Sequence, residues 1–500
     1  MSFLKKLAGD SVLYGLSSIV GRMLNWLLVI VHTRIFEQPR LLSDNAQLYT
    51  YVIPLNIIYT FGMETAFFRF ASDKQHRSTY FNIILSFIML LSGTLSTLFI
   101  LGAVPLIDAI GYPGKEHLIY WLAIIIAVDA ICAIAFVKLR VENKAKRFVK
   151  IRLINIFINI GLNVFYLMFC NYILQGLILP EWQPFAAYFY NPAVGPDYII
   201  WANYVASLIT LVLLWKEFVG FKFTLDLPKL KPVLAYAYPL LIMGLAGSIN
   251  LTADRLMFRS LLPTGFYPGF NTEDAFSIYA NVYKLSIFMT LVVQAYRYAA
   301  DPFFFSKMGD KNSPNMIALS TKWFTIACIV IWVGVSINLD WIGLLIGKTY
   351  RSGLAVVPWL LLGNLFIGVY ANVSIWYKLT DQTKYGTWIT IIGMSFTVLL
   401  NILLIPVLGY LGCSITFALS SLLMVAACYY YGQRYYPVPY DLKSILIYLG
   451  VAGALIVLNS QFAFHSLLVS IIVHGMVLLL FLAFLIYREG LHTRFLKKTV

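Results

Sequence analysis

Charged residues are scarce in this sequence. Only 12% of the 500 residues are Asp, Glu, Lys or Arg, 60% are hydrophobic, and the mean hydropathy is +0.79. A water-soluble domain normally carries about twice that share of charge, so a soluble protein is excluded. The apolar runs are continuous and about 20 residues long, unlike the short alternating segments of a transmembrane β-barrel. The sequence therefore predicts an all-α, polytopic membrane protein.

Residues for metal, redox or nucleotide chemistry are also missing. The five cysteines lie singly in apolar runs with no paired spacing, and the six histidines lack the spacing of metal ligands. There is no glycine-rich phosphate-binding loop, and no outward loop carries paired carboxylates or a nucleophile beside a base. We therefore expect no cofactor, no metal site and no enzyme activity.

Acidic residues are outnumbered by basic ones, 22 against 37, which gives a formal charge of +15. The basic residues concentrate in the loops predicted to be cytoplasmic, above all in residues 138–152, whereas the longest outward loop, residues 179–197, has no Lys or Arg. This asymmetry is the positive-inside rule, and it places both termini in the cytoplasm. No outward loop is large enough for a nucleic-acid module, so we expect no nucleic-acid partner.

Fourteen apolar segments are long enough to span a membrane as helices. They cover about Ser11–Phe36, Gln47–Ala71, Tyr80–Val104, His117–Val137, Ile151–Leu177, Tyr198–Phe218, Pro239–Leu262, Phe276–Ala300, Pro314–Ile337, Leu354–Trp376, Tyr385–Leu408, Leu411–Tyr431, Ser444–Leu458 and Leu467–Tyr487.

The two halves of the chain resemble each other. Arg69 in Phe-Arg-Phe-Ala follows Tyr51 by 18 residues, and Arg297 in Tyr-Arg-Tyr-Ala follows Tyr279 by the same interval. Because six helices return the chain to its starting side, a duplicated six-helix unit gives two parallel repeats, which typically bind substrate between them. We predict repeats over residues 1–221 and 232–433, separated by a cytoplasmic linker, and two additional C-terminal helices over residues 443–488.

Six basic residues lie inside predicted spans, where a charge costs about 2.5–3.5 kcal/mol and usually faces a cavity or a partner. All six lie on four of the fourteen helices, namely the first two helices of each repeat. This concentration suggests one solvated cavity that attracts an anion. Local salt bridges, an Arg259 that only reaches the outer surface, and topology signals at Arg69 and Arg297 remain alternatives. The six are Arg22, Arg69, Arg255, Arg259, Lys284 and Arg297.

Three acidic residues are also embedded, Glu64, Asp129 and Asp254. They either pair with the arginines or bind a coupling cation or proton. We expect Asp254 to neutralise a cation on another helix rather than Arg255, because adjacent residues do not share a helix face. Three asparagines at four-residue intervals in the fifth span, at 155, 159 and 163, are expected to hydrogen-bond between helices.

Several segments carry a resemblance to a known family. They are Gly9-Asp10-Ser11-Val12-Leu13-Tyr14-Gly15-Leu16-Ser17-Ser18 with Gly21-Arg22, Gly62-Met63-Glu64-Thr65-Ala66-Phe67-Phe68-Arg69, Asp254-Arg255, Tyr283-Lys284-Leu285, Tyr296-Arg297 and Trp376-Tyr377-Lys378-Leu379-Thr380. Over the first twelve helices the chain resembles the multidrug/oligosaccharidyl-lipid/polysaccharide (MOP) exporter superfamily, and within it the O-antigen-type polysaccharide-biosynthesis flippases. The loop after the first helix, residues 38–47, departs from these relatives because it is longer and lacks glycine.

The resemblance implies a flippase of the bacterial inner membrane. Its substrate would be an oligosaccharide linked to a polyprenyl pyrophosphate, as in lipopolysaccharide synthesis, with membrane lipids around the tail. Arg22, Arg255 and Lys284 would hold the pyrophosphate, Arg69 and Arg297 would recruit it, and the acids Glu64, Asp129 and Asp254 would tune the cavity or couple it to an ion.

Two other functions stay open. A cation-coupled multidrug antiporter of the same superfamily would need an acidic cavity, and six embedded bases against three embedded acids oppose it. A membrane glycosyltransferase or glycan polymerase would need a catalytic outward loop, which the sequence does not offer.

Overall fold

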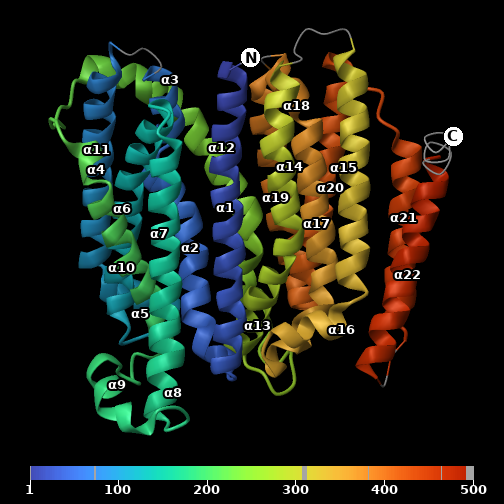
Figure 1. Ribbon diagram of the computed structural model, residues 1–500, viewed down its shortest axis with the longest axis horizontal. Helices are drawn as coiled ribbons and strands as arrows, with labels where there is room; N and C mark the ends of the chain where they lie inside the picture. The colour runs from blue at the N-terminus through green and yellow to red at the C-terminus, as the bar shows by residue number, and fades with distance from the viewer. Residues whose placement is uncertain are drawn as a thin grey trace. The chain divides into compact units, whose positions relative to one another are not determined.

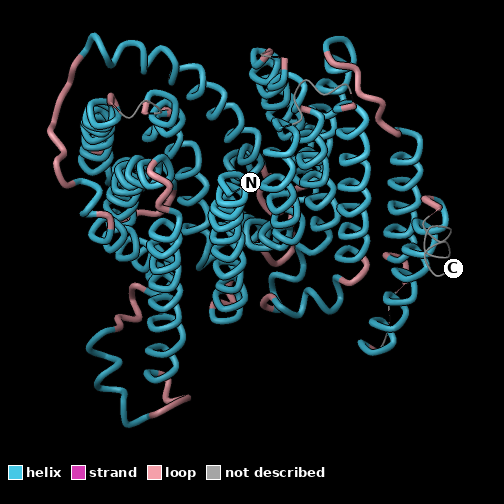
Figure 2. Tube along the Cα trace, turned by 45° about the horizontal axis from the view of Figure 1, so that its top comes forward, coloured by secondary structure: helices cyan, strands magenta, loops and turns pink. Residues whose placement is uncertain are grey.

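The computed structural model describes residues 2–71, 75–306, 312–380, 382–462, 464 and 466–490. Within these ranges the chain is helical and has no strand (Figure 2). In this described part of the chain, twelve helices are long and apolar enough to cross a membrane. Helix α1 and the broken pair α2–α3 bring the number of spans to about 14. The predicted all-α, polytopic membrane architecture is confirmed.

The chain forms two compact units. Unit 1 runs to Ser260 and resumes over Thr264–Ser277, and unit 2 holds Leu261–Pro263 and the chain from Ile278 onward. Figure 1 labels the α-helices of unit 1. Among the shorter elements named η, η2 is π-helical and the others are 3-10 helices. The elements of unit 1 are α1 (Ser2–Ile35), η1 (Pro39–Leu42), α2 (Ser43–Thr60), α3 (Met63–Phe70), α4 (Arg77–Leu101), α5 (Ala103–Ile110), α6 (Glu116–Val141), α7 (Ala145–Asn163), η2 (Val164–Cys170), α8 (Asn171–Leu174), η3 (Pro180–Trp182), α9 (Gln183–Phe189), η4 (Gly195–Asp197), α10 (Tyr198–Leu213), α11 (Trp215–Phe218), α12 (Leu227–Leu261) and the first half of α13 (Thr272–Tyr283).

Unit 2 continues from the second half of α13. Its elements are η5 (Lys284–Ser286), α14 (Ile287–Ser306), α15 (Ser313–Ser336), α16 (Leu339–Ile342), η6 (Gly343–Leu345), η7 (Lys348–Val356), α17 (Val357–Val373), α18 (Ile375–Leu379), α19 (Thr383–Leu408), α20 (Tyr410–Tyr435), α21 (Leu442–Asn459) and α22 (Leu467–Arg488).

Helix α12 packs with unit 1, although the sequence repeat predicts it as the first helix of the second bundle. Its residues Val233 and Ala237 are fully buried in the same core as Tyr59, Met63 and Phe67. The helix also begins at Leu227, so half of the predicted cytoplasmic linker, residues 222–231, is helical. The predicted duplication of a six-helix unit, over residues 1–221 and 232–433, stays a prediction.

Helix α6 is the centre of unit 1. It packs against α2, α3, α4 and α10, and 67% of its spanning segment is buried, compared with 17% for the α7–α8 segment. An apolar helix such as α6, buried on most sides, needs no polar face. Because only 17% of the α7–α8 segment is buried, helix α7 presents most of its surface outside the core of the unit.

A break separates α2 from α3. Phe61 and Gly62 both adopt left-handed backbone angles, with φ of 49° and 69°. At Gly62 a Cβ atom would lie 3.1 Å from the carbonyl oxygen of Ala237, so the turn is closely packed against α12. Glycine meets both demands, because it tolerates positive φ and adds no side chain. The break fixes where the α3 residues Glu64 and Arg69 lie.

Helices α17, α19 and α20 form the packed centre of unit 2. Close approaches at glycines hold them together, for example at Gly363, where a Cβ atom would lie 2.4 Å from the ring of Phe417. This use of small residues is usual between membrane helices, where backbones gain contact by approaching closely.

The two added helices dock on α15. At one end, Lys322 Nζ lies 2.9 Å from Asp441 and 2.7 Å from Glu489, and the Tyr448 hydroxyl donates to Glu489 at 2.5 Å. At the other end, Ser470 on α22 donates a hydrogen bond to Asp340 of α16. The hydrogen bond from Lys322 holds the pKa of Asp441 at about 2, so this interaction is complete above the usual pKa of an aspartate and is lost as pH falls toward 2.

We expect Lys322→Met to loosen α21 and α22. Loss of the ammonium group leaves Glu489, which is 10% exposed, without its charge partner, at a cost on the order of 1 kcal/mol. Limited proteolysis should then cut the connection over residues 436–441 faster than in the wild type. Lys443→Met removes a nearby exposed lysine and is the matched control; equal proteolysis of both variants would contradict the docking role of Lys322.

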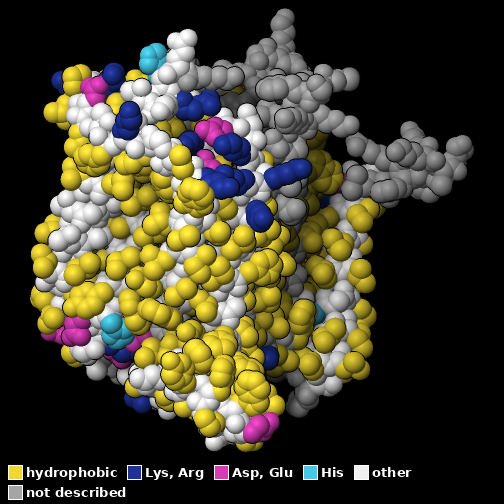
Figure 3. Space-filling model, turned by 60° about the vertical axis from the view of Figure 1, so that its left-hand side comes forward, with side chains coloured by type: hydrophobic (Ala, Val, Ile, Leu, Met, Phe, Trp, Pro, Cys, Tyr) yellow, Lys and Arg dark blue, Asp and Glu magenta, His cyan; other side chains and the backbone are white. Residues whose placement is uncertain are grey.

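Charge is unevenly placed on the face of the molecule in Figure 3. Most Lys and Arg side chains on that face gather toward one end, and hydrophobic side chains cover the broad band beyond them. Such a band is expected where lipid tails surround a protein.

Candidate functional site

Arg22 lies on α1, 13 residues before the helix ends at Ile35, which is about 20 Å along the helix axis. Its side chain is exposed, and among the described residues no hydrogen bond or ion pair satisfies it. The neighbouring Gly21 faces α7, because a Cβ atom there would lie 2.7 Å from Ile156 of that helix. The close α1–α7 contact thus fixes the rotation of α1 and directs Arg22 out of the unit's core.

Arg255 contacts Asp254, and the expectation that they would not pair is wrong. Arg255 Nε lies 3.5 Å from Asp254 Oδ1, and Nη2 donates to the Leu251 carbonyl at 2.6 Å. The long side chain curls back along α12, so residues that point to different faces still meet. Asp254 is 5% exposed and Arg255 is half-buried, so the carboxylate partly neutralises this cation.

Arg69 and Glu64 occupy opposite ends of α3. The Arg69 guanidinium lies 4.4 Å from the ring centroid of Tyr236 on α12, a cation–π contact that links the two helices. Glu64 is exposed in the first turn, where the helix dipole favours a carboxylate. Arg69 therefore has a structural role in unit 1 whatever else it binds.

Asp129 is positioned by α10. Its Oδ1 accepts a hydrogen bond of 2.9 Å from the hydroxyl of Ser207, and its side chain is nevertheless exposed.

The predicted interhelical role of the asparagines is confirmed at two sites. Asn155 donates to Ala206 and Thr210 of α10 at 3.1 and 2.8 Å, and Asn163 lies 3.0 Å from His32 of α1.

Lys284 and Arg297 belong to unit 2. Lys284 begins η5, the interruption between α13 and α14; its Nζ donates to Asn281 at 3.1 Å, and its side chain is exposed. Arg297 is exposed on α14. Unit 1 holds Arg22, Arg69 and Arg255, so the predicted meeting of all five bases in one cavity stays a prediction.

A polar cluster that the sequence analysis did not predict surrounds Arg259. Its guanidinium donates to the Ile110 carbonyl at 3.0 Å, to the Tyr112 hydroxyl at 2.9 Å and to Gln47, and forms an ion pair of 3.2 Å with Glu273. The alternative of a local salt bridge is thus confirmed for Arg259. These contacts join α12 and α13 to α2 and α5 at the end of unit 1 that is predicted to face outward.

A second set of charges continues this cluster. Lys115 forms ion pairs with Asp44 and, at 3.1 Å, with Asp197, and His117 lies 3.0 Å from the same Asp197. Both acids are buried, at 4% and 2% exposure. Burial alone would lower the pKa of Lys115, but the two carboxylates outweigh it and hold that pKa above its ordinary value.

We call these residues together the outer cluster: Asp44, Gln47, Tyr112, Lys115, His117, Asp197, Arg259 and Glu273. In the sequence, the signal that could have indicated this cluster was the presence of opposite charges at the outward ends of several predicted spans. Helix order alone does not say which ends meet, because that depends on packing of segments up to 212 residues apart.

The whole chain was compared with known proteins. No protein-family model and no curated protein sequence matches it. Among solved structures, lipid II flippase MurJ in an inward closed conformation matches with a TM-score of 0.72 and 15% identity, over 96% of this chain and 99% of MurJ. The chain shares its fold with this flippase.

Two further structures agree with this fold. A MATE family transporter of the MOP superfamily, inward-facing, gives a TM-score of 0.58 at 12% identity over 89% of this chain and 96% of the transporter. The Vibrio cholerae MATE transporter VcmN in the bent form gives 0.52 at 10% identity over 90% and 100%. All three are flippases or transporters. The likeness shows that the chain shares the fold of these membrane transporters, and its membership of the MOP superfamily stays a prediction.

Proposed function

We propose that this MOP-fold protein is a flippase that moves a polyprenyl-pyrophosphate-linked oligosaccharide from the inner to the outer leaflet of a bacterial cytoplasmic membrane by alternating access. The observation that carries the proposal is the exposed Arg22 on a membrane-spanning helix, without a partner among the described residues. A cation at that depth is tolerated where it faces water or an anion. Both termini would lie in the cytoplasm.

The basic residues divide into two groups under this proposal. Arg22, Arg255 and Lys284 hold the pyrophosphate, whose oxygens match the fork of donors on an arginine. Arg69 and Arg297 recruit the head group from the cytoplasmic side. Because Asp254 already contacts Arg255, it sets how much positive charge Arg255 offers, and Glu64 and Asp129 tune the cavity or couple transport to a cation or proton.

A cation-coupled antiporter is the second candidate, supported by the likeness to MATE transporters. Such a protein would bind its organic cation through exposed carboxylates, of which Glu64 and Asp129 are the two described in the spans of unit 1. The excess of embedded bases favours the anionic substrate.

Reconstitution distinguishes the two. Purified protein in liposomes should flip a fluorescent oligosaccharide carried on polyprenyl pyrophosphate, measured by loss of protection from an external reagent, and should not transport an organic cation against a sodium or proton gradient. Cation transport with no flipping would overturn the proposal. Liposomes with no protein give the background rate.

A further inference from the structure

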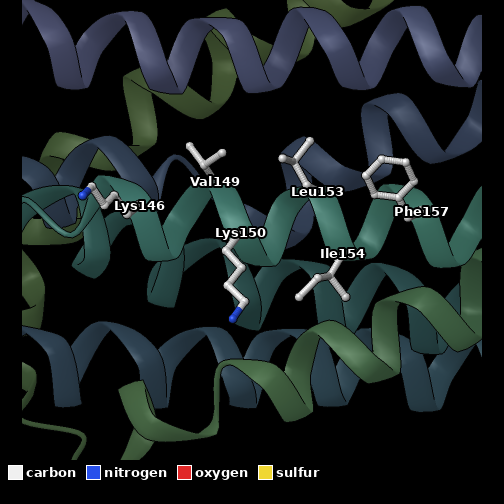
Figure 4. Close-up of a pocket in the computed structure, with 6 residues that line it drawn as sticks. All are labelled: Lys146, Val149, Lys150, Leu153, Ile154 and Phe157. Carbon is white, nitrogen blue, oxygen red and sulfur yellow. The ribbon is translucent and has the colours of Figure 1, made fainter.

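A groove runs along one face of α7 near the end of the span that is predicted to be cytoplasmic. Its volume is about 420 Å³, and all six described residues that line it come from α7: Lys146, Val149, Lys150, Leu153, Ile154 and Phe157 (Figure 4). They recur at three- and four-residue intervals, so they share a face of the helix. The other faces are occupied, by α1 at Ile156 and by α10 at Asn155.

The groove has a charged end and an apolar end. In Figure 4 Lys146 lies at one end of the row and Phe157 at the other. Phe157 is 61% exposed and follows Lys150 by seven residues, about 10 Å deeper along the helix. A membrane-spanning helix that exposes this much of an apolar side chain faces lipid tails, so the lysine end lies at the level of the lipid head groups.

Lys146 and Lys150 differ from the other basic residues of the same segment. Both are exposed, and neither has a hydrogen-bond or ion-pair partner among the described residues. Their basic neighbours all have partners. Three form polar contacts: Lys138 with the Glu217 carbonyl at 2.5 Å, Lys144 with Glu142 at 2.7 Å and Arg147 with Glu217 at 2.9 Å. The other two form cation–π contacts, Arg140 with the Phe68 ring at 5.6 Å and Arg152 with the Phe136 ring at 4.3 Å. The two ammonium groups that border the groove are thus the ones left for an external anion.

We propose that this α7 groove binds an anionic phospholipid of the cytoplasmic leaflet. Lys146 and Lys150 contact the phosphate, and one acyl chain lies along Val149, Leu153 and Phe157. Basic pockets beside membrane helices on the cytoplasmic side bind anionic head groups in this way. A soluble phosphate would leave the apolar part of the groove empty and would gain little from two exposed lysines. The site uses no residue assigned to the transported substrate, so it stands independently of the proposed function.

Photo-crosslinking of the full-length protein tests this site. The probe is a photoactivatable phosphatidic acid in phosphatidylcholine vesicles, and the readout is label on the α7 peptide. Lys146→Gln with Lys150→Gln should reduce labelling of that peptide roughly 10-fold or more, whereas arginine at both positions should retain it. Phe157→Ala should reduce labelling while both lysines remain.

The matched control is Lys222→Gln with Lys231→Gln, which removes two exposed lysines from the same predicted side and should leave labelling unchanged. Equal loss in this control would overturn the proposal, since any two charges would then serve. Equal labelling by photoactivatable phosphatidylcholine would also overturn it. So would displacement of the label by soluble glycerol phosphate at the concentration of the lipid, because the chain contacts would then contribute nothing.

Discussion

Replacement of Arg22 by alanine is expected to slow flipping of the lipid-linked oligosaccharide by roughly 10- to 100-fold. A hydrogen bond between charged groups contributes about 1.5–3 kcal/mol, and each 1.4 kcal/mol corresponds to a factor of ten. Arg22 has no ion-pair or hydrogen-bond partner among the described residues, so no such contact of the protein is lost with its side chain. The measurement is the initial flipping rate in liposomes at equal protein content.

Two further variants separate charge from shape at this position. Arg22→Lys keeps the charge and loses the paired donors, so it should fall between the wild type and alanine. Met23→Ala shortens the next exposed side chain of α1, which is 48% exposed, and should leave the rate unchanged. A wild-type flipping rate in Arg22→Ala would show that Arg22 does not bind the substrate.

Replacement of Asp197 by alanine is expected to lower the free energy of unfolding of unit 1 by about 2 kcal/mol. Breaking a buried ion pair by removing one partner costs about 3–5 kcal/mol, and we reduce that figure because Lys115 and His117 are each about one-third exposed. Asp197 is itself almost fully buried, so water does not replace its contacts. Thermal unfolding of the purified protein should show a Tm several degrees below that of the wild type.

Asp108→Ala supplies the control. Asp108 is an exposed acid of α5, in the same unit, with no side-chain partner among the described residues. Its replacement should leave Tm within experimental error. Equal Tm values for the Asp197 and Asp108 variants would show that the outer cluster does not stabilise the unit.

Hydropathy was sufficient to predict the spans, because a 20-residue apolar run has one stable arrangement in a bilayer. It did not predict the break at Phe61 and Gly62, which depends on how closely α12 approaches that turn. It also did not predict the start of α12 at Leu227, since two lysines and two prolines interrupt the apolar run over residues 227–232.

The candidate site was harder to predict because charges act through side-chain reach and tertiary contact. Helical spacing led to the wrong prediction that Asp254 and Arg255 do not pair. Spacing alone ignores the length of the Arg255 side chain, which folds back along the helix. The outer cluster around Arg259 joins residues from distant segments, and only the packed structure brings them together. The choice of an anionic substrate, by contrast, follows from residue types alone and stays a prediction.

The most direct measurement is a structure of the protein with bound polyprenyl pyrophosphate. We predict the pyrophosphate within hydrogen-bond distance of the guanidinium groups of Arg22 and Arg255 and of the Lys284 ammonium group, in a water-accessible cavity. A pyrophosphate bound elsewhere, with each of these three bases held in an ion pair of its own, would contradict the account.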